Sequence, residues 1–297
     1  MRFLVPALCA ALIASPVLAQ QFVLPPSDAN AKNIVPAKNA LIEQFAEWQD
    51  GGAIRIAMGK AADEAPAGAS HYEQKTFAWP TGTMRVLHFR KGRGPVLHQV
   101  TYETEMYVLE GTAEVGVNGK PVKLNAGDAV FMPSGELRNP KPSGDVVVLL
   151  WNVGTTSKDP KAKVIRGKDL KSAPAASWVE NGKAMNARTP EEIKKAPATA
   201  ARWSTKRYEF DGNSIRVATF AKSGTSGAGA GPMDALIYIA KGKLGRQEGP
   251  EYGVLQAGDG LREPAGQSGH WEGHEDSIFI ASSAPFPSGF APTKPLK

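Results

Sequence analysis

Residues 107–135 read YVLEGTAEVGVNGKPVKLNAGDAVFMPSG, and this stretch decides the fold. Its apolar and polar residues alternate over short runs, which is typical of β-strands with one buried face. Asn118-Gly119 separates two of these runs. Because both turn residues tolerate a positive φ, this dipeptide is the strongest short signal for a β-hairpin. We therefore expect strands over 113–117 and 121–124 with a tight turn between them.

The same pattern returns 131 residues later, without gaps, as YIAKGKLGRQEGPEYGVLQAGDGLREPAG over residues 238–266. The matching residues are Arg85-Val86 and Arg216-Val217, Phe89 and Phe220, Lys91 and Lys222, Tyr107 and Tyr238, Gly111 and Gly242, Ala126-Gly127-Asp128 and Ala257-Gly258-Asp259, Pro133 and Pro264, and Gly135 and Gly266. A single register over this length indicates a duplicated domain rather than a short solenoid repeat.

Each copy has the pattern of an all-β domain. In the first copy, the expected strands cover 84–89, 106–109, 113–117, 121–124, 129–132 and 146–151. Short strands separated by Gly and Pro turns are typical of a sandwich or a barrel. Helices are expected only at the periphery. One is expected over the apolar positions Leu41, Ile42, Phe45 and Trp48, and another begins at Thr189 as N-cap with Pro190 in its first turn.

The positive charge of the chain is concentrated in one segment. The net charge is +6, and residues 155–206 alone hold twelve Lys and Arg against five Asp and Glu. The segment is rich in Ala and Pro and poor in aromatic residues, which favours a solvated interdomain connector. Nucleic-acid binding would require aromatic or arginine positions interleaved on a platform, so we expect no nucleic-acid partner.

The N-terminus predicts export. Arg2 precedes a short apolar run that ends in Val17-Leu18-Ala19 before Gln20, a pattern typical of a secretory signal peptide cleaved near Ala19-Gln20. Cleavage would remove Cys9, the only cysteine, and leave a mature chain without disulfides or thiolate metal sites. No later stretch has the length and hydropathy of a membrane span. We expect a soluble periplasmic or secreted protein.

The repeated motifs resemble those of the cupin family. Gly127 with Pro133-Ser134-Gly135 fits the frame of the second cupin motif, Gly258 with Pro264-Ala265-Gly266 fits it again, and Tyr107 to Gly111 resembles the end of the first motif. The resemblance implies a bicupin with two jelly-roll barrels. The expected divisions are a signal peptide at 1–19, an N-terminal extension with a short helix at 20–69, barrels at 70–153 and 205–285, a basic Ala/Pro-rich connector at 154–204 and a tail at 286–297.

Cupins hold one metal ion in each barrel through three histidines and a glutamate, and most of these ligands are absent here. The chain has five histidines, fewer than the six that two complete sites would need. In the first copy the family positions fall on His98, Val100, Thr104 and Arg138, and in the second on Gly229, Gly231, Ala235 and Gly269. His270 lies one residue past the last position. It forms a polar cluster with Trp271, Glu272, His274, Glu275 and Asp276, which we interpret as a surface cluster, with a metal or ligand site as the alternative.

These positions point to one altered pocket in the N-terminal barrel. The candidate ligand-binding residues are His98, Arg138, Glu103, Glu105, Tyr102 and His88. Arg138 would repel a metal ion and offers a fork of donors to a carboxylate or phosphate, while His98 is a candidate catalytic base. A non-standard metal site would use His98 with Glu103 or Glu105, because a β-bulge can turn a neighbouring residue inward.

Two functions of different classes follow. The favoured one is a bicupin that binds a small anionic or sugar-like molecule in its N-terminal barrel, with a structural C-terminal barrel and a homodimer as the implied assembly. The alternative is a cupin-type metalloenzyme, a dioxygenase, decarboxylase, isomerase or lyase, with one divalent transition metal near His98. Whether the protein is an enzyme stays open, because a fold alone does not define a function.

Overall fold

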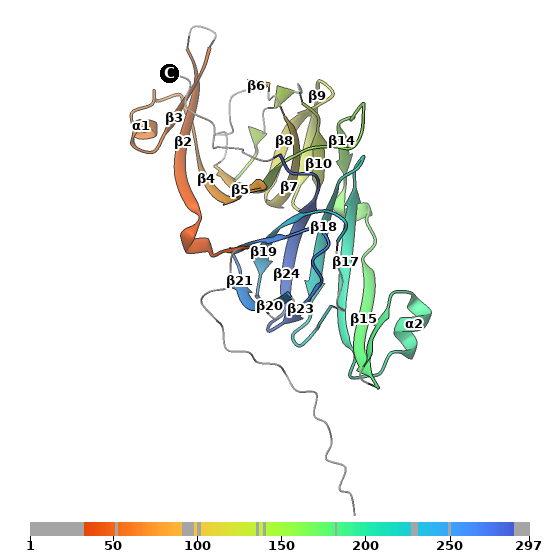
Figure 1. Ribbon diagram of the computed structural model, residues 1–297. Helices are drawn as coiled ribbons and strands as arrows, with labels where there is room; N and C mark the ends of the chain where they lie inside the picture. The colour runs from red at the N-terminus through yellow and green to blue at the C-terminus, as the bar shows by residue number, and fades with distance from the viewer. Residues whose placement is uncertain are drawn as a thin grey trace, which may run out of the picture.

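The computed structural model describes residues 33–287, except for 51–52, 91–97, 100–101, 135–136, 139–140, 182, 227–230 and 249–250. The chain forms two antiparallel β-barrels, and each consists of one eight-stranded sheet closed, in the described residues, by two smaller sheets in the first barrel and one in the second. Figure 1 shows the barrels one above the other, with the first half of the chain in the upper barrel. The expected all-β fold of two jelly-roll barrels with short peripheral helices is therefore confirmed. The expected signal peptide lies outside the described residues.

The first half of the chain carries strands β1 to β13. Their bounds are β1 Ile34–Val35, β2 Leu41–Asp50, β3 Ala53–Met58, β4 Ser70–Trp79, β5 Gly82–Phe89, β6 His98–Gln99, β7 Glu103–Glu110, β8 Thr112–Val117, β9 Lys120–Asn125, β10 Ala129–Met132, β11 Leu137–Arg138, β12 Lys141–Pro142 and β13 Val146–Val153, with helix α1 at Lys60–Asp63. The hairpin predicted at Asn118-Gly119 is confirmed, because it joins β8 and β9 and both residues have positive φ, 51° and 70°.

The second half repeats this order. Its bounds are β14 Lys163–Ile165, β15 Ala173–Glu180, β16 Lys183–Ala187, α2 Pro190–Lys195, β17 Ala201–Glu209, β18 Ser214–Phe220, β19 Ala235–Lys241, β20 Lys243–Glu248, β21 Glu251–Gln256, β22 Gly260–Glu263, β23 Gly269–Gly273 and β24 Ser277–Ser283. Adding 131 to the bounds of β8, β9 and β10 gives the bounds of β20, β21 and β22. The duplication also covers β2, β3 and α1, which correspond to β15, β16 and α2.

The helix expected around Leu41 and Phe45 is wrong, because residues 41–50 form β2. This strand pairs with β3 on one side and β4 on the other, and Phe45 stacks on Tyr72 with ring centroids 5.3 Å apart. Pairing along both edges overrides the helical spacing of the apolar residues, and Leu41 and Ile42 stay exposed. The helix expected at Thr189 is confirmed as α2, whose capping box joins Thr189 to Glu192.

The segment 154–204, expected as a solvated connector, carries regular structure. Strand β14 adds to the sheet of the N-terminal barrel through β10, whereas β15 and β16 extend the sheet of the C-terminal barrel through β17. Reciprocally, β1 from the first half pairs with β22 of the C-terminal barrel. Each half therefore gives one short strand to the barrel of the other, which ties the two barrels together.

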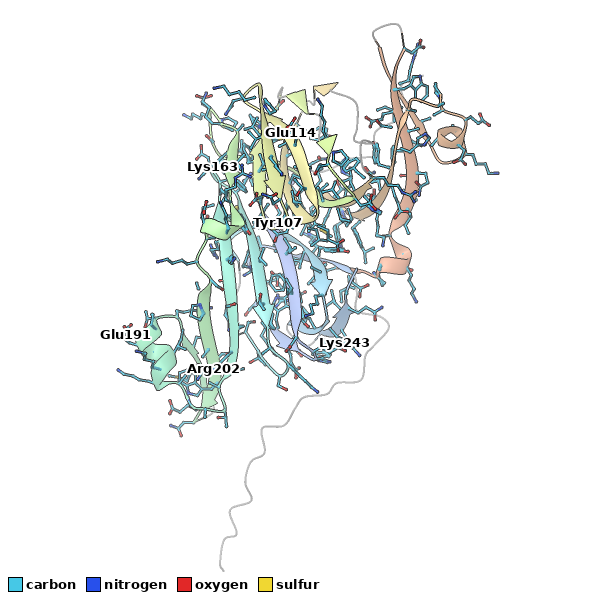
Figure 2. All side chains as sticks on the ribbon, turned by 180° about the vertical axis from the view of Figure 1, so that it is seen from behind. Tyr107, Glu114, Lys163, Glu191, Arg202 and Lys243 are labelled. Atoms are coloured by element: carbon cyan, nitrogen blue, oxygen red, sulfur yellow. The ribbon has the colours of Figure 1, made fainter. Side chains whose placement is uncertain are left out.

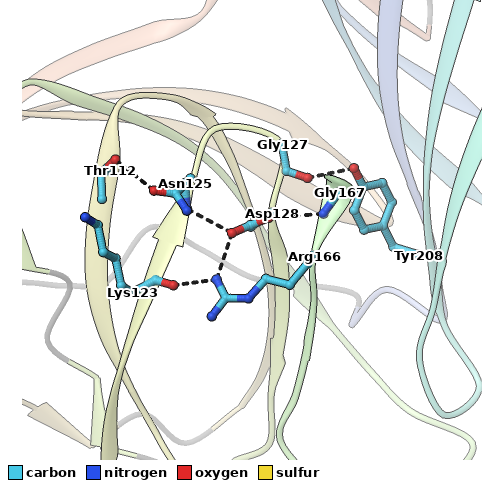
Figure 3. Close-up of polar contacts among 8 residues, drawn as sticks. All are labelled: Thr112, Lys123, Asn125, Gly127, Asp128, Arg166, Gly167 and Tyr208. Carbon is cyan, nitrogen blue, oxygen red and sulfur yellow. Dashed lines mark hydrogen bonds and ion pairs between the residues drawn. The ribbon is translucent and has the colours of Figure 1, made fainter. Parts of the chain in front are cut away.

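Two aspartates of the repeat fix these exchanged segments. The Asp128 carboxylate accepts hydrogen bonds from the backbone N–H of Asn125 at 2.9 Å and of Gly167 at 3.1 Å, and from Arg166 Nη1 at 2.8 Å (Figure 3). Its repeat partner Asp259 accepts from the backbone N–H of Ala37 at 2.7 Å and of Gln256 at 2.9 Å. The shared Ala-Gly-Asp sequence is thus a structural device that anchors the segment entering from the other half.

The barrels share one hydrophobic core cluster (Figure 2, around Tyr107). Tyr107 meets Tyr208 edge-on with centroids 5.7 Å apart, and their repeat partners Tyr238 and Phe77 meet edge-on at 6.1 Å. This correspondence gives the junction the pseudo-twofold character of an isologous interface. Tyr208 also donates a hydrogen bond of 2.7 Å from its hydroxyl to the carbonyl oxygen of Gly127 (Figure 3).

Candidate functional site

The two residues expected to mark the N-terminal pocket are neighbours along the backbone. His98 and Arg138 are register partners in the two-stranded sheet of β6 and β11. The structure describes only their backbone, so their side chains lie outside the described part of the molecule. The family position Thr104 is fully buried, and strand alternation puts it on the same face of β7 as Met106 and Val108, which pack in the interior cluster of this barrel.

Glu105 does not line the N-terminal barrel, which corrects its expected role as a pocket or metal ligand. Its side chain lies on the opposite face of β7 from Thr104, and its Oε2 accepts a hydrogen bond of 2.5 Å from Ser282 Oγ of the other barrel. The other oxygen, Oε1, is buried without a described partner. Burial raises the pKa of Glu105 to about 8, although the Ser282 hydrogen bond opposes this rise. A bulge is present between β7 and β13, but it lies at Val147/Val148 and does not turn Glu105 inward.

The remaining candidates of the N-terminal barrel are scattered. Glu103 shares the strand face of Glu105, and His88 lies on the opposite face of β5 from Leu87 and Phe89, so neither is on the inward face of its strand. Tyr102 precedes β7, is half-buried, and is close enough to Tyr72 to influence its pKa electrostatically. Of the expected residues with described side chains, only Tyr102 influences a residue of the barrel interior, Tyr72.

Sequence reasoning missed two polar pairs in this barrel. Arg85 donates from Nη2 to Asn152 Oδ1 at 2.5 Å, and Arg85 Nε and Asn152 Nδ2 are buried without partners. Tyr72 donates from its hydroxyl to Glu47 Oε1 at 2.5 Å. Burial and Glu47 raise the pKa of Tyr72 well above its ordinary value, whereas Arg85 lowers it. These residues make the interior of the N-terminal barrel polar on one side.

The C-terminal barrel, expected to be structural, contains a cavity of about 300 Å³. This volume is at the lower end of the range for small-molecule sites. Its lining comprises Arg188, Trp203, Arg207, Ser214, Arg216, Phe220, Ser226, Gly231, Pro232, Met233, Ala235, Arg246, Glu263, Pro264, Gln267, Gly269, Trp271, Phe279 and Ser283. Four arginines thus face one glutamate among the described lining residues.

The cavity includes positions that the cupin resemblance assigns to metal ligands. Three of the four family ligand positions, Gly231, Ala235 and Gly269, belong to the lining, and the fourth, Gly229, is outside the described residues. The guanidinium of Arg246 fills the space of the last ligand, because a Cβ added at Gly269 would lie 2.5 Å from Arg246 Nη1. The small residues at these positions therefore leave space in the barrel, and the Arg246 guanidinium occupies part of it.

Arg246 is firmly held. Its Nη2 lies 2.8 Å from Glu263 Oε1 and its Nε 3.3 Å from Glu248 Oε1, and the Arg246 side chain is 4% exposed. Trp271 donates from Nε1 to Glu263 Oε1 at 3.1 Å, and the Arg246 guanidinium lies 5.2 Å from the Trp271 ring centroid. Burial raises the pKa of Glu248, an effect that Arg246 opposes. Arg246 and its two carboxylates form a compensated network.

Arg216 is loosely held by comparison. Its Nη2 lies 3.6 Å from Glu263 Oε2, beyond hydrogen-bond distance, and its Nε is buried without a partner. Burial lowers the pKa of Arg216 and Glu263 opposes this, whereas Arg207, Arg246 and Arg188 lower it further. The four guanidinium groups repel one another, so a bound anion would stabilise them by reducing this repulsion.

The residues present in the C-terminal barrel do not fit a transition metal. Glycine and alanine cannot ligate, and the nearby Arg216 and Arg246 carry permanent positive charge. Within the described part of the chain, no three His, Cys, Asp or Glu residues are grouped so that they could hold a metal ion. We therefore derive no chemical step through a metal in this barrel.

The histidines near residue 270 lie away from the cavity. His270 belongs to β23 and alternates with the inward Trp271, while His274 follows the strand and its Nε2 lies 2.6 Å from the Tyr252 hydroxyl oxygen. Glu272 Oε2 is 3.8 Å from His274 Nε2. Both His274 and Glu272 are about one-third exposed, which agrees with the interpretation of a surface cluster.

Comparisons with known proteins agree with the fold. Residues 85–152 match the family model described as Cupin domain. No curated protein matches the sequence. The match to AerE from Microcystis aeruginosa covers 93% of that chain. Within the described residues, no helix has the length and apolar character needed to cross a membrane.

Three solved structures illustrate the similarity. AerE from Microcystis aeruginosa has a TM-score of 0.55 and 13% identity, with 73% of this chain and 93% of that chain covered. HEPD from Streptomyces albus, with 2-hydroxyethylphosphonate and Fe(II) bound, has a TM-score of 0.57 and 9% identity over 91% and 79% of the two chains. A mutant of Bacillus subtilis oxalate decarboxylase has a TM-score of 0.54 and 12% identity over 86% and 78%. At these identities the likeness concerns the fold alone.

Proposed function

We propose that this chain, which matches the Cupin domain model over residues 85–152 and carries a second barrel of the same order, binds a small organic anion in the cavity of its C-terminal barrel. The observation that carries the proposal is Arg216, a guanidinium that lines the cavity with a buried Nε that has no partner. A carboxylate is the natural partner of such a group, because its two oxygens match two parallel N–H donors.

The excess of positive charge supports the same ligand class. Arg188, Arg207, Arg216 and Arg246 line the cavity, and they face Glu263 in the lining and Glu248 beside Arg246. Arg207 is also paired with Glu209 at 3.3 Å, so one positive charge is left over when each of these three carboxylates neutralises one guanidinium. A neutral sugar would leave this charge uncompensated, so an anion is favoured over a sugar-like ligand.

The proposal moves the ligand from the N-terminal to the C-terminal barrel. The expected N-terminal pocket rested on His98, Arg138 and the neighbouring glutamates, and Glu105 belongs to the barrel junction instead. The metalloenzyme built on His98 remains the alternative. Elemental analysis of the purified protein separates the two functions, because a stoichiometric metal that is lost in His98→Ala would support the metalloenzyme.

We also infer that the mature protein is exported and begins near Gln20, on the basis of the signal-peptide pattern in residues 1–19. Cell fractionation and N-terminal sequencing of the mature protein test this inference. A cytoplasmic chain that retains Met1 to Ala19 would contradict it.

Isothermal titration calorimetry with benzoate tests the anion proposal. The intact mature protein should bind benzoate, and Arg216→Lys should weaken binding at least tenfold because lysine cannot supply the planar fork of donors. Arg202→Ala is the matched control, since Arg202 is exposed and on the opposite face of β17 from Trp203. Equal affinity in the wild type and in Arg216→Lys would overturn the proposal, and so would the absence of binding by any small carboxylate.

A further inference from the structure

The cavity of the C-terminal barrel is lined by a continuous row of four aromatic rings. Trp203 stacks on Phe220 with centroids 5.9 Å apart and planes inclined by 9°. Phe220 and Phe279 are 5.9 Å apart, and Phe279 and Trp271 are 4.7 Å apart. All four residues line the cavity, so its apolar wall is aromatic along its length.

A positive charge lies at each end of this aromatic row. At one end, the Arg188 guanidinium lies 4.7 Å from the Trp203 ring centroid. At the other, Arg246 lies 5.2 Å from the Trp271 centroid and Arg216 lies 5.2 Å from the Phe279 centroid. The guanidinium groups lie over ring faces, a cation–π arrangement that holds them in place at the cavity wall.

Strand register sets the separation of the two ends. Trp203 is the register partner of Phe220, and Arg207 is the register partner of Arg216 in the β17–β18 pair. Positions 216 and 220 are four residues apart on one strand face, which corresponds to about 13 Å between their Cα atoms. Ala218 lies between them with a small side chain, and Phe279 is its partner on β24. The cavity is therefore elongated, with an apolar middle.

Each end of the aromatic row also has a buried hydrogen-bond donor without a partner. Arg216 Nε and Trp203 Nε1 are both buried and without partners, and both belong to residues of the lining. A buried donor that stays unpaired destabilises the folded state, so such donors are expected to find an acceptor in the functional state. A ligand that fits this cavity brings acceptors to both ends.

We propose that the ligand carries two acidic groups joined by an apolar, preferably aromatic, spacer, with one group at Arg216 and the other at Arg188. The proposal rests on the proposed function and sharpens it from an anion to a dianion. Two acidic groups match the two ends of the aromatic row, because each end has a guanidinium and a buried donor without a partner. The spacer matches the aromatic wall, which a compact anion with adjacent charges would leave uncovered.

Calorimetric titrations with terephthalate and benzoate test this proposal. The two probes share a benzene ring and a carboxylate, and terephthalate adds a second carboxylate at the opposite end. The intact protein should bind terephthalate at least tenfold more tightly than benzoate. Adipate, a flexible aliphatic dianion, should bind more weakly than terephthalate because it pays conformational entropy and stacks less well.

The substitution Arg188→Ala tests whether the second carboxylate of terephthalate binds at Arg188. This exposed residue can be replaced without disturbing the barrel core, and the ratio of the two affinities should fall from at least tenfold to near one. Arg202→Ala should leave the ratio unchanged, because Arg202 is exposed and does not belong to the lining. Circular dichroism of each variant confirms that it is folded.

The outcomes separate the two levels of the proposal. If benzoate binds as tightly as terephthalate, or if Arg188→Ala leaves the ratio unchanged, the dianion is wrong and the anion site stands. If terephthalate, benzoate and adipate all fail to bind, the anion site is wrong, and the dianion proposal is wrong with it.

Discussion

The carboxyl group of Glu105 in the N-terminal barrel accepts a hydrogen bond of 2.5 Å from the hydroxyl of Ser282 in the C-terminal barrel. Both side chains are fully buried. Across the strands, Glu105 pairs with Trp151 and Ser282 pairs with Leu236, and these four residues are two pairs of repeat equivalents. The centre of the junction is therefore asymmetric, because one half supplies an acid where the other supplies leucine.

This asymmetry predicts a pH-dependent stability. The folded state holds Glu105 protonated up to a pKa of about 8, whereas an unfolded glutamate releases its proton near its ordinary value of 4.5. Between these values the folded state binds the extra proton, so stability falls as the pH rises, by about 1.4 kcal/mol per pH unit. Below pH 4.5 the contribution is fully favourable, and above pH 8 the loss is complete.

Glu105→Gln should remove this slope, because glutamine keeps an oxygen acceptor for Ser282 and does not ionise in this range. Urea unfolding at intervals between pH 5 and pH 8 measures the difference between the two proteins, and it should grow with pH in favour of the variant. A constant difference across this interval would show that Glu105 does not titrate in the junction.

The aspartates that anchor the exchanged strands should contribute unequally. Asp128→Ala leaves two backbone N–H groups without their acceptor and removes the ion pair with Arg166, which keeps the Lys123 carbonyl oxygen as a partner. We expect a loss of roughly 3 kcal/mol in the free energy of unfolding. Asp259→Ala removes the two equivalent backbone contacts and should cost less. Denaturant unfolding of both variants compares them, and an equal or larger loss for Asp259→Ala would show that the Arg166 contact contributes nothing.

Two glycines at former metal-ligand positions should differ in their tolerance of a methyl group. At Gly269 a Cβ would lie 2.3 Å from the Gln247 carbonyl oxygen and 2.5 Å from Arg246 Nη1, so Gly269→Ala should displace Arg246, weaken benzoate binding several-fold and lower the melting temperature. At Gly231 the nearest atom would be 3.4 Å away, so Gly231→Ala is the control with intact stability. Equal melting temperatures for the two variants would contradict the tight fit around Gly269.

Removing a negative charge from the cavity should strengthen anion binding. Glu263 accepts from Trp271 and lies 2.8 Å from Arg246 and 3.6 Å from Arg216. Glu263→Gln leaves both guanidinium groups less compensated, so the affinity for benzoate should rise several-fold while thermal stability falls. Glu114→Gln, an exposed change in the other barrel, is the control. An unchanged or weaker affinity in Glu263→Gln would place the anion elsewhere.

Much of the fold could be predicted because the repeat and the turn residues are local signals. Asn118-Gly119 and the Ala-Gly-Asp sequence predicted β8, β9 and β10, and the repeat predicted a second barrel of the same kind. The strand β2 could not be predicted, because its apolar residues have helical spacing and only pairing with β3 and β4 decides its structure. The exchange of β1 and β14 is equally non-local.

The site was harder to predict for a physical reason. Counting surviving metal ligands directed attention to His98 and Arg138, whereas the cavity arises where ligand positions have become Gly231, Ala235 and Gly269. Its charged residues Arg246 and Glu263 come from different strands and meet only when the barrel closes. The match between Arg85 and Arg216 was a visible signal, and both prove to have a buried Nε without a partner.

The central claim is that an organic anion occupies the C-terminal barrel beside Arg216. The most direct test is the crystal structure of the intact mature protein with 4-bromobenzoate, whose bromine is located by anomalous scattering. We predict one strong bromine peak within the aromatic row of Trp203, Phe220, Phe279 and Trp271, with the carboxylate at Arg216. A bromine peak in the N-terminal barrel beside Arg85, with none in the C-terminal barrel, would contradict the account.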